Sequence, residues 1–295
     1  MSLLLVGAAL SATLSATSAF GADKKSVLLI AGRPSHGPGD HEHNAGVLLL
    51  KKCLDANARQ VDVKAYLNNG WPSAEDLAKA DTILMYSDGG GGHVALQGDR
   101  LQQLAAQMKR GAGIVCLHYA VEVPKDKGGP EFKEWLGGYF ETDWSVNPHW
   151  TADFKELPKH PISNGVQPFS TNDEWYFHMR FKDNMAGVQP ILSAIAPEST
   201  MNRGDGPHSG NPTVRASVAA KTPQHVAWAV ERPDGGRGFG FTGGHHHKGW
   251  GNDDQRKLVL NAILWTAKAE VPEKGVESTI TPEDLAANLD PKGKR

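Results

Sequence analysis

Short apolar runs alternate with amphipathic segments through the first 120 residues of the chain. The runs are of strand length and almost uniformly apolar, as in SVLLIAG at 26–32. The segments between them place apolar side chains at helical spacing, as Val47, Leu50 and Leu54 do. This alternation is typical of a parallel sheet covered by helices on both faces, and it predicts a doubly wound α/β fold. The predicted strands are 26–32, 60–67, 82–86 and 113–118, and the predicted helices are 45–57, 95–109 and a short helix capped by Ser73.

After residue 120 the alternation becomes less regular. Residues 196–213 lack periodicity, which predicts a long surface loop. From Val271 onward the chain is charged and contains proline, so we expect a loosely packed tail at 271–295. The pattern favours one domain over 23–270 with an elaborated C-terminal half. Its further predicted elements are a helix at 130–136, strands at 149–157, 188–195, 225–231 and 237–243, and a closing helix at 253–268.

The N-terminal stretch LLLVGAALSATLSATSAF, residues 3–20, is apolar and rich in small residues. It ends in SAFGAD, where small residues offer a cleavage site, so residues 1–22 are similar to a secretory signal peptide. No Lys or Arg precedes Leu3, which departs from the usual pattern. A membrane anchor is the alternative, although the stretch is short and interrupted by Ser and Thr. We expect an exported protein, periplasmic or extracellular, with no membrane contact after cleavage.

The charge balance limits the classes of partner. Lys plus Arg number 31 and Asp plus Glu number 33, which gives a formal net charge of −2. Nucleic-acid and anionic-membrane surfaces need clustered basic charge, so neither partner is expected. Two Cys are too few for a disulfide scaffold or a four-Cys zinc site. Cys53 lies in a predicted helix and Cys116 in a predicted strand, so we expect two buried thiols.

Histidines gather at the predicted ends of the strands. Parallel sheets bind their ligands outside the C-terminal ends of the strands, and eight of the 13 histidines fall in loops at that edge. Of the triplet 245–247, at most two rings can face one point. The cluster predicts a functional centre, which is either a divalent metal site, zinc or similar, or a set of hydrogen-bonding groups. The eight are His36, His41, His43, His93, His118, His245, His246 and His247, and we assign His36, His41, His43 and His245 as metal ligands.

A second group of polar residues lies in NDEWYFH at 172–178. If this segment is extended, Glu174, Tyr176 and His178 share one face, while Asp173 and Trp175 share the other. A carboxylate, a phenol and an imidazole side by side suit acid–base work on a hydroxylated substrate. The alternative is a polar strand edge. Asp173 and Glu174 point apart, so they do not resemble the carboxylate pair of a glycosidase.

A glycine run follows the predicted strand at 82–86. Backbone amides of such a run can converge on an anion, so we expect Gly90, Gly91 and His93 to bind substrate; a flexible turn is the alternative. No nucleotide fingerprint is present, and no organic cofactor is expected. Six of the eight tryptophans fall near predicted loops or helix ends, where they could stack on sugar rings or pack as core. We assign Trp175 and His246 to substrate binding; the six are Trp71, Trp135, Trp144, Trp150, Trp175 and Trp250.

These pieces together resemble the ThuA-like proteins, named for trehalose utilisation, in the class I glutamine amidotransferase-like superfamily. The match rests on four motifs in order across 26–268: HEHNAG in the first loop, IVCLHYA, NDEWY, and GRGFGFTGGH before a helix ending in ILWTAK. The resemblance implies a flavodoxin-like sheet and a role in carbohydrate metabolism, with no defined reaction. By position, it also implies functional roles for His43 or His41, Asp173, Glu174 and His245.

The resemblance places His118 at the strand-to-helix turn where amidotransferases of this superfamily keep a Cys nucleophile. Cys116 lies two residues earlier, inside the strand, so a Cys-dependent glutaminase is not expected. We expect instead an enzyme that acts on a sugar or glycoside by hydrolysis or proton abstraction. Its small-molecule carbohydrate substrate is unspecified, and so is its oligomeric state. The alternative is a carbohydrate-binding protein without catalysis. The residues assigned to catalysis are His118, Asp173, Glu174 and Tyr176.

Overall fold

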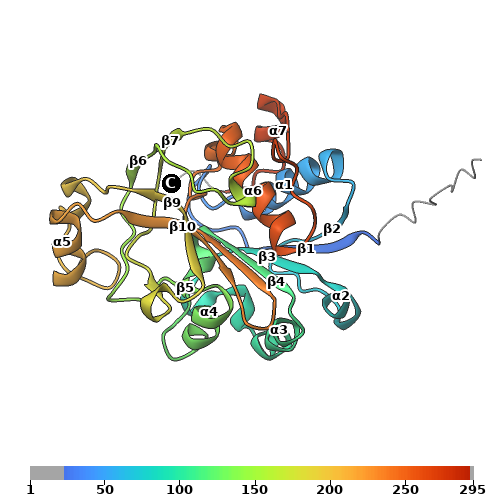
Figure 1. The fold of residues 1–295 in the computed structure, drawn as a ribbon, viewed down its shortest axis with the longest axis horizontal. Coiled ribbons are helices and arrows are strands. Elements are labelled where there is room, and N and C mark those ends of the chain that lie inside the picture. The colour runs from blue at the N-terminus through green and yellow to red at the C-terminus, as the bar shows by residue number, and fades with distance from the viewer. Residues whose placement is uncertain (1–22, 293–295) are drawn as a thin grey trace, which may run out of the picture.

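The computed structural model describes residues 23–292, which build one central seven-stranded sheet (Figure 1). The strand order is β2-β1-β3-β4-β11-β10-β9. Neighbouring strands from β2 to β11 are parallel, and β10 runs antiparallel to both β11 and β9. This confirms the predicted mostly parallel, flavodoxin-like α/β fold. The strands of the sheet are β1 (Lys25–Ala31), β2 (Val61–Tyr66), β3 (Thr82–Tyr86), β4 (Gly113–Leu117), β9 (Val188–Ala194), β10 (Gln224–Glu231) and β11 (Arg237–Phe241).

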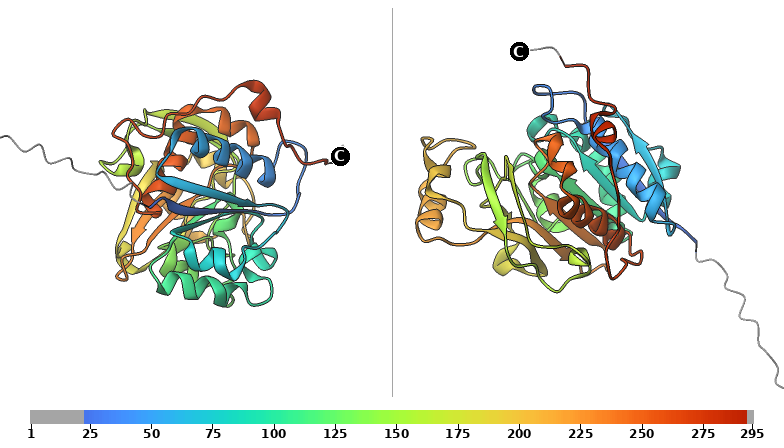
Figure 2. Two further views of the ribbon diagram at one scale, coloured as in Figure 1. Left: turned by 90° about the vertical axis from the view of Figure 1, so that its right-hand side faces the viewer. Right: turned by 90° about the horizontal axis from the view of Figure 1, so that it is seen from above.

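Helices cover both faces of the sheet because alternate side chains of each apolar strand point to opposite faces. On β1, Leu29 packs into one core and Leu28 and Ile30 into the other. In Figure 1 and Figure 2, α1, α6 and α7 lie on one side and α2, α3 and α4 on the other, with α5 set apart. The helices are α1 (His43–Asn57), α2 (Ala74–Lys79), α3 (Arg100–Lys109), α4 (Gly129–Trp135), α5 (Pro212–Ala219), α6 (Asp253–Thr266) and α7 (Pro282–Ala286).

The elaborated second half adds two small antiparallel pairs. Strands β6 (Trp150–Phe154) and β7 (Phe169–Asp173) form one, and β5 (Gly138–Tyr139) and β8 (Arg180–Phe181) form the other. Strand β7 ends at Asp173, so Glu174 immediately follows it. The β6–β7 pair therefore carries the NDEWY segment to the edge of the main sheet where β4 and β11 end.

The C-terminal segment is not the loosely packed tail that its composition predicted. Val276 is buried, and Thr281 forms a capping box with Asp284 at the start of α7. Near the end of the described chain, the Lys292 Nζ lies 3.2 Å from the Glu42 carboxylate, and both side chains are buried. The charges that indicated a solvated tail are used in specific pairs against the first loop, which composition alone cannot show.

Residues 196–211 form the expected long and largely exposed loop, but with local structure that the sequence did not predict. They contain a 3₁₀ turn at Glu198–Met201, and α5 already begins at Pro212, with Asn211 as its N-cap. His208 pairs through Nε2 with the Glu122 carboxylate at 3.0 Å and stacks on Phe140. The segment is therefore fastened to the domain by side chains that have no periodic signature.

The expected signal peptide at 1–22 lies outside the described residues. Within 23–292, no helix is both long and apolar enough to cross a membrane. Cys53 and Cys116 are both buried free thiols, as expected.

Candidate functional site

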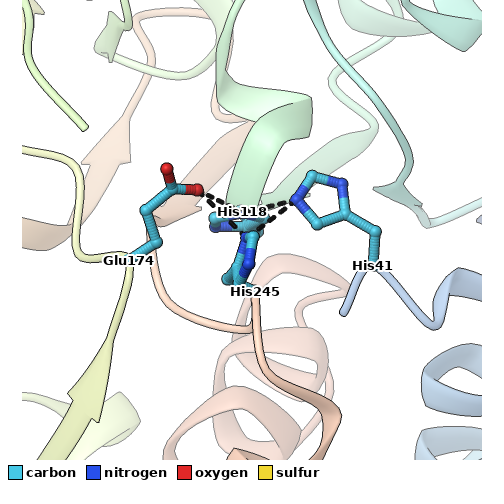
Figure 3. A group of neighbouring side chains, drawn as sticks. All are labelled: His41, His118, Glu174 and His245. Atoms are coloured by element: carbon cyan, nitrogen blue, oxygen red, sulfur yellow. Dashed lines mark hydrogen bonds and ion pairs between the residues drawn. The ribbon is translucent and has the colours of Figure 1, made fainter. Parts of the chain in front are cut away.

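Three histidines and one glutamate meet at the C-terminal edge of the parallel strands (Figure 3). His118 Nε2 lies 3.1 Å from His41 Nε2 and 3.5 Å from Glu174 Oε2. His245 Nδ1 lies 3.0 Å from His41 Nε2 and 3.0 Å from the same glutamate oxygen. In Figure 3, His118 and His245 stand between Glu174 and His41. All four side chains are buried, and we call this group the His₃Glu centre.

Unusual backbone conformations place these side chains. His118 directly follows β4 and opens a 3₁₀ turn with φ +52°, and His41 has φ +48°. Residues other than glycine and asparagine adopt such left-handed φ values rarely, and often at functional sites. Gly244, with φ +98°, turns the chain after β11 so that His245 reaches the centre. The His41 amide donates to the His245 carbonyl, which joins the first loop to this turn.

The far nitrogen of each histidine faces an oxygen acceptor. His118 Nδ1 lies 2.8 Å from the Thr242 carbonyl, and His41 Nδ1 lies 2.8 Å from the Asp88 carboxylate. His245 Nε2 lies 3.7 Å from Asp40. Because a carbonyl and a carboxylate only accept hydrogen bonds, Nδ1 of His118 and His41 must carry the proton. Their Nε2 lone pairs then face each other at 3.1 Å, a repulsive contact that a cation between them would relieve.

The distances fit a metal ion held by these four ligand atoms. Zinc binds imidazole and carboxylate at about 2.0–2.1 Å, so its ligand atoms stand about 3.3–3.4 Å apart. The four close pairs in the His₃Glu centre span 3.0–3.5 Å, and all four ligand atoms lie within 4.8 Å of one another. An oxygen acceptor hydrogen-bonded behind the ligating imidazole, as at His118 and His41, is the usual outer-shell arrangement of zinc sites. The residues present therefore fit a divalent ion.

The electrostatics favour cation binding at His41 and Glu174 and oppose it at His245. Burial disfavours the charge of His245, but the hydrogen bond and charge of Glu174 outweigh burial and raise the pKa of that ring, so a metal ion has to displace its proton. Burial, and then the neighbouring imidazoles, hold the pKa of His41 far below its usual range, so its ring is neutral. Burial opposes the charge of Glu174, but hydrogen bonds with His118 and His245 outweigh it and lower the pKa of that carboxyl. Burial and the charge of Glu174 raise the pKa of Tyr176, so its hydroxyl keeps its proton. That hydroxyl lies 3.2 Å from His118 Nε2.

The predicted site residues separate into those that meet at the centre and those that do not. His41 and His245 of the predicted ligands belong to it, joined by His118 and Glu174, which were assigned to catalysis. His36 stacks on His41 with ring centroids 3.5 Å apart but is exposed. His246 binds Asp40 through Nδ1 at 2.7 Å, beside the centre.

His43 is not among the four converging ligands. It is fully buried at the start of α1, and its Nδ1 contacts the Arg33 carbonyl at 3.1 Å. Its Nε2 lies 3.8 Å from Asp88 Oδ1, the oxygen that His41 Nδ1 contacts, and so faces the acceptor behind His41. The first loop turns sharply at His41, so the two-residue spacing that suggested a shared face does not bring both rings to one point.

Asp173 holds the backbone of the site. Its carboxylate accepts hydrogen bonds from the amides of Gly244, His245 and His246, and only 1% of the residue is exposed. These amides occupy both carboxylate oxygens, which leaves Asp173 positioning the turn that carries His245. The assignment of Asp173 to acid–base catalysis is therefore corrected.

Three further residues predicted to bind substrate or to act in acid–base catalysis are instead engaged in contacts within the protein. His93 is fully buried, with Nε2 on the Ala120 carbonyl and Nδ1 on the Ala95 amide. Trp175 is fully buried and donates to the Thr171 carbonyl. His178, expected beside Glu174 and Tyr176, stacks on Trp144. Trp135, Trp150 and Trp250 are also buried, so these aromatic side chains serve packing.

The glycine run forms a 3₁₀ turn at Gly90–Gly92. The Gly90 amide donates to the Glu122 carbonyl, and a side chain at Gly91 would meet open space. The close approach of the Tyr119 carbonyl, 2.2 Å from where a Cβ would stand, requires glycine at position 89. The run thus gives tight packing of the neighbouring turn, with one of its amides already bonded.

Sequence reasoning missed several residues around the centre. Asp88 follows β3, so the strand-end rule that located the histidines also covered it. Asp40 adjoins His41 in the first loop. His149 gave no signal; its Nε2 reaches to 3.9 Å from the Glu174 carboxylate, and its ring lies 5.0 Å from that of His245.

Cys116 is fully enclosed in β4, and burial raises the pKa of its thiol well above the usual range. Its position two residues before the turn leaves His118, rather than a thiol, at the strand end. Cys116 therefore lies inside the strand, as its spacing from His118 predicted.

The family profile for trehalose utilisation, ThuA, matches residues 27–266. The chain belongs to the ThuA family. Its fold is similar to that of a ThuA-like protein from Bacteroides uniformis, at 16% identity and a TM-score of 0.59, covering 83% of this chain and 92% of that one. A ThuA-like protein from Parabacteroides merdae is similar at 15% identity and a TM-score of 0.56, covering 87% and 93%. No curated protein matches the chain.

Proposed function

We propose that this ThuA-family protein is a metal-dependent enzyme that acts on a carbohydrate. The observation that supports the proposal best is the convergence of four ligand atoms, with 3.0–3.5 Å between the atoms of each close pair. The atoms are His41 Nε2, His118 Nε2, His245 Nδ1 and Glu174 Oε2. The family's association with trehalose utilisation supports the substrate class. A bound divalent ion would polarise a substrate oxygen or lower the pKa of bound water. Hydrolysis and proton abstraction beside a carbonyl both use that chemistry, and hydrolysis is favoured because no organic cofactor motif is present.

The chain's own residues supply orientation and a proton donor. Asn147 Nδ2 donates to Glu174 Oε1 at 3.1 Å, which leaves Oε2 toward the centre. Asp88 and the Thr242 carbonyl set the tautomers of His41 and His118. The Tyr176 hydroxyl, protonated at neutral pH, is placed to donate a hydrogen bond to a substrate oxygen beside His118.

Metal analysis by mass spectrometry tests the proposal. We expect about one zinc, manganese or similar ion per chain in protein purified without chelator. Glu174→Gln keeps the shape of the side chain but removes its charge, so we expect it to lose bound metal and activity while its thermal unfolding stays cooperative. His225→Gln, on β10 and hydrogen-bonded to Ser193, is the matched control and should retain both.

Protein with no stoichiometric metal would contradict the proposed metal centre. Unchanged turnover in Glu174→Gln would contradict the assignment of that residue. A sugar that binds but is recovered unchanged after long incubation with metal-loaded protein would favour the binding-protein alternative.

We also propose that the protein is exported, because residues 1–22 are similar to a signal peptide. The intact mass of protein recovered from a secreting host tests this. A mass that begins near Asp23 supports export, and a retained N-terminus in the cytoplasmic fraction contradicts it.

A further inference from the structure

A cavity of about 310 Å³, lined mainly by polar and charged residues, adjoins the His₃Glu centre at Glu174. This volume is at the lower end of the range for small-molecule pockets and suits one sugar ring rather than a polymer. Glu174 belongs to both sites, since Oε2 faces the histidines and Oε1 faces Asn147 in the cavity wall. The lining residues are Asn147, Pro148, His149, Glu174, Ser199, Thr200 and Arg203.

Arg203 is the cation of this cavity, and it has no carboxylate partner within residues 23–292. Its Nη2 donates to the neutral Asn147 side-chain oxygen at 2.9 Å and to the His208 carbonyl at 3.1 Å. The nearby Asp205 is taken by Arg215 at 2.6 Å. Among the described residues, five arginines pair with an acidic side chain, and four others besides Arg203 do not. The five are Arg180, Arg215, Arg232, Arg237 and Arg256, and the four are Arg33, Arg59, Arg100 and Arg110. Arg203 is the one of these that lines the cavity beside Glu174.

The two charged side chains of the cavity wall have different partners. Glu174, the acidic residue of the lining, lies 3.0 Å from His245 Nδ1 and 3.5 Å from His118 Nε2 and accepts a hydrogen bond from Asn147. Within the described part of the chain, Arg203 donates only to neutral acceptors. Arg203 then offers the remaining nitrogens of a planar fork that matches a carboxylate or phosphate.

We infer that the substrate carries an anionic sugar unit, with the carboxylate or phosphate of that unit on Arg203 and its ring beside Glu174. This inference rests on the proposed function, since it names the substrate class of the same site. Asn147 and Ser199 supply neutral hydrogen-bonding groups for ring hydroxyls between the two ends. Arg203 lies in the 196–211 segment, which the sequence predicts to be a surface loop. This segment therefore recognises the charge of the substrate.

Calorimetric titration with D-glucuronate, D-glucose 6-phosphate and D-glucose tests the inference. We expect at least one of the two anions to bind the wild-type protein about tenfold or more tightly than glucose, as charge-assisted hydrogen bonds provide. The preferred anion identifies carboxylate or phosphate as the group bound. Arg203→Ala should abolish the preference, and Arg203→Lys should restore part of it because the charge returns without the fork.

Arg59→Ala is the matched control. It removes one positive charge just after α1, at the opposite edge of the sheet, and should keep the preference. Equal binding of glucose and both anions, a preference that survives Arg203→Ala, or no binding of either anion at millimolar concentration would overturn the inference.

Metal content, measured on the same preparations, separates this inference from the proposed function. Arg203→Ala should leave metal content unchanged because Arg203 contacts none of the four ligand atoms. Anion preference in a protein without metal would keep the inference and contradict the metal centre. Bound metal without anion preference would keep the metal centre and contradict the inference.

Discussion

Two turns at the same edge of the sheet each carry a buried histidine, yet they differ in what the imidazole has left to offer. At the turn after β4, Nδ1 of His118 is hydrogen-bonded to the Thr242 carbonyl, and Nε2 faces His41, Glu174 and Tyr176. At the turn after β3, His93 spends both nitrogens on the backbone. Burial and residue type are the same in both. A ring nitrogen without a backbone partner is therefore what makes His118 available for chemistry, whereas His93 has only a structural role.

Substitutions at His118 and His93 are expected to differ most in their effect on metal affinity. His118→Gln should weaken zinc binding by more than about 100-fold, because loss of a direct ligand exceeds the effect of an outer-shell change. His93→Gln should leave zinc affinity unchanged. Chelator competition measures both. If zinc affinity fell equally in the two variants, both histidines would affect zinc binding only by stabilising the fold, and His118 would not be a ligand.

A smaller effect is expected from the acceptor behind His41. Asp88→Asn weakens the hold on His41 Nδ1, and zinc affinity should fall by about 10- to 100-fold while the ion still binds. Asp62→Asn makes the same charge change on the exposed side of β2 and should have no effect. An unchanged zinc affinity in Asp88→Asn would remove Asp88 from the description of the site.

The third effect concerns acid stability rather than metal binding, and it arises from His93. Burial lowers the pKa of His93 to about 4, against about 6.5 in the unfolded chain. The unfolded chain therefore binds a proton that the folded chain refuses, so the free energy of unfolding falls as pH drops from 6.5 toward 4. The loss from this residue is at most about 3 kcal/mol.

His93→Gln removes the titrating group while keeping a donor and an acceptor. Urea unfolding at pH 7 and pH 4.5 should show a smaller decrease in stability for this variant than for the wild type. An equal decrease in both proteins would show that other groups, such as His160, carry the acid sensitivity.

Much of the fold follows from local pattern. The strands β1, β3 and β4 and the helices α1 and α6 lie where periodicity predicted them, because each apolar run must be buried whichever neighbours it finds. The edge of the sheet that carries the site also follows, since parallel strands bring their C-terminal loops together. The contact of Lys292 with Glu42 does not follow from local pattern, because the sequence around a charged residue does not reveal which distant residue will pair with it.

By itself, the sequence determined the family, the α/β architecture and the gathering of histidines at one edge. Only the tertiary structure decided which of those histidines converge. The choice depends on acceptors from distant segments: Thr242 for His118, Asp88 for His41, and the backbone of residues 244–246 held by Asp173 for His245. A ring nitrogen becomes a metal ligand or a structural donor according to what lies within about 3 Å of it, and those distances exist only once the strands have been assembled.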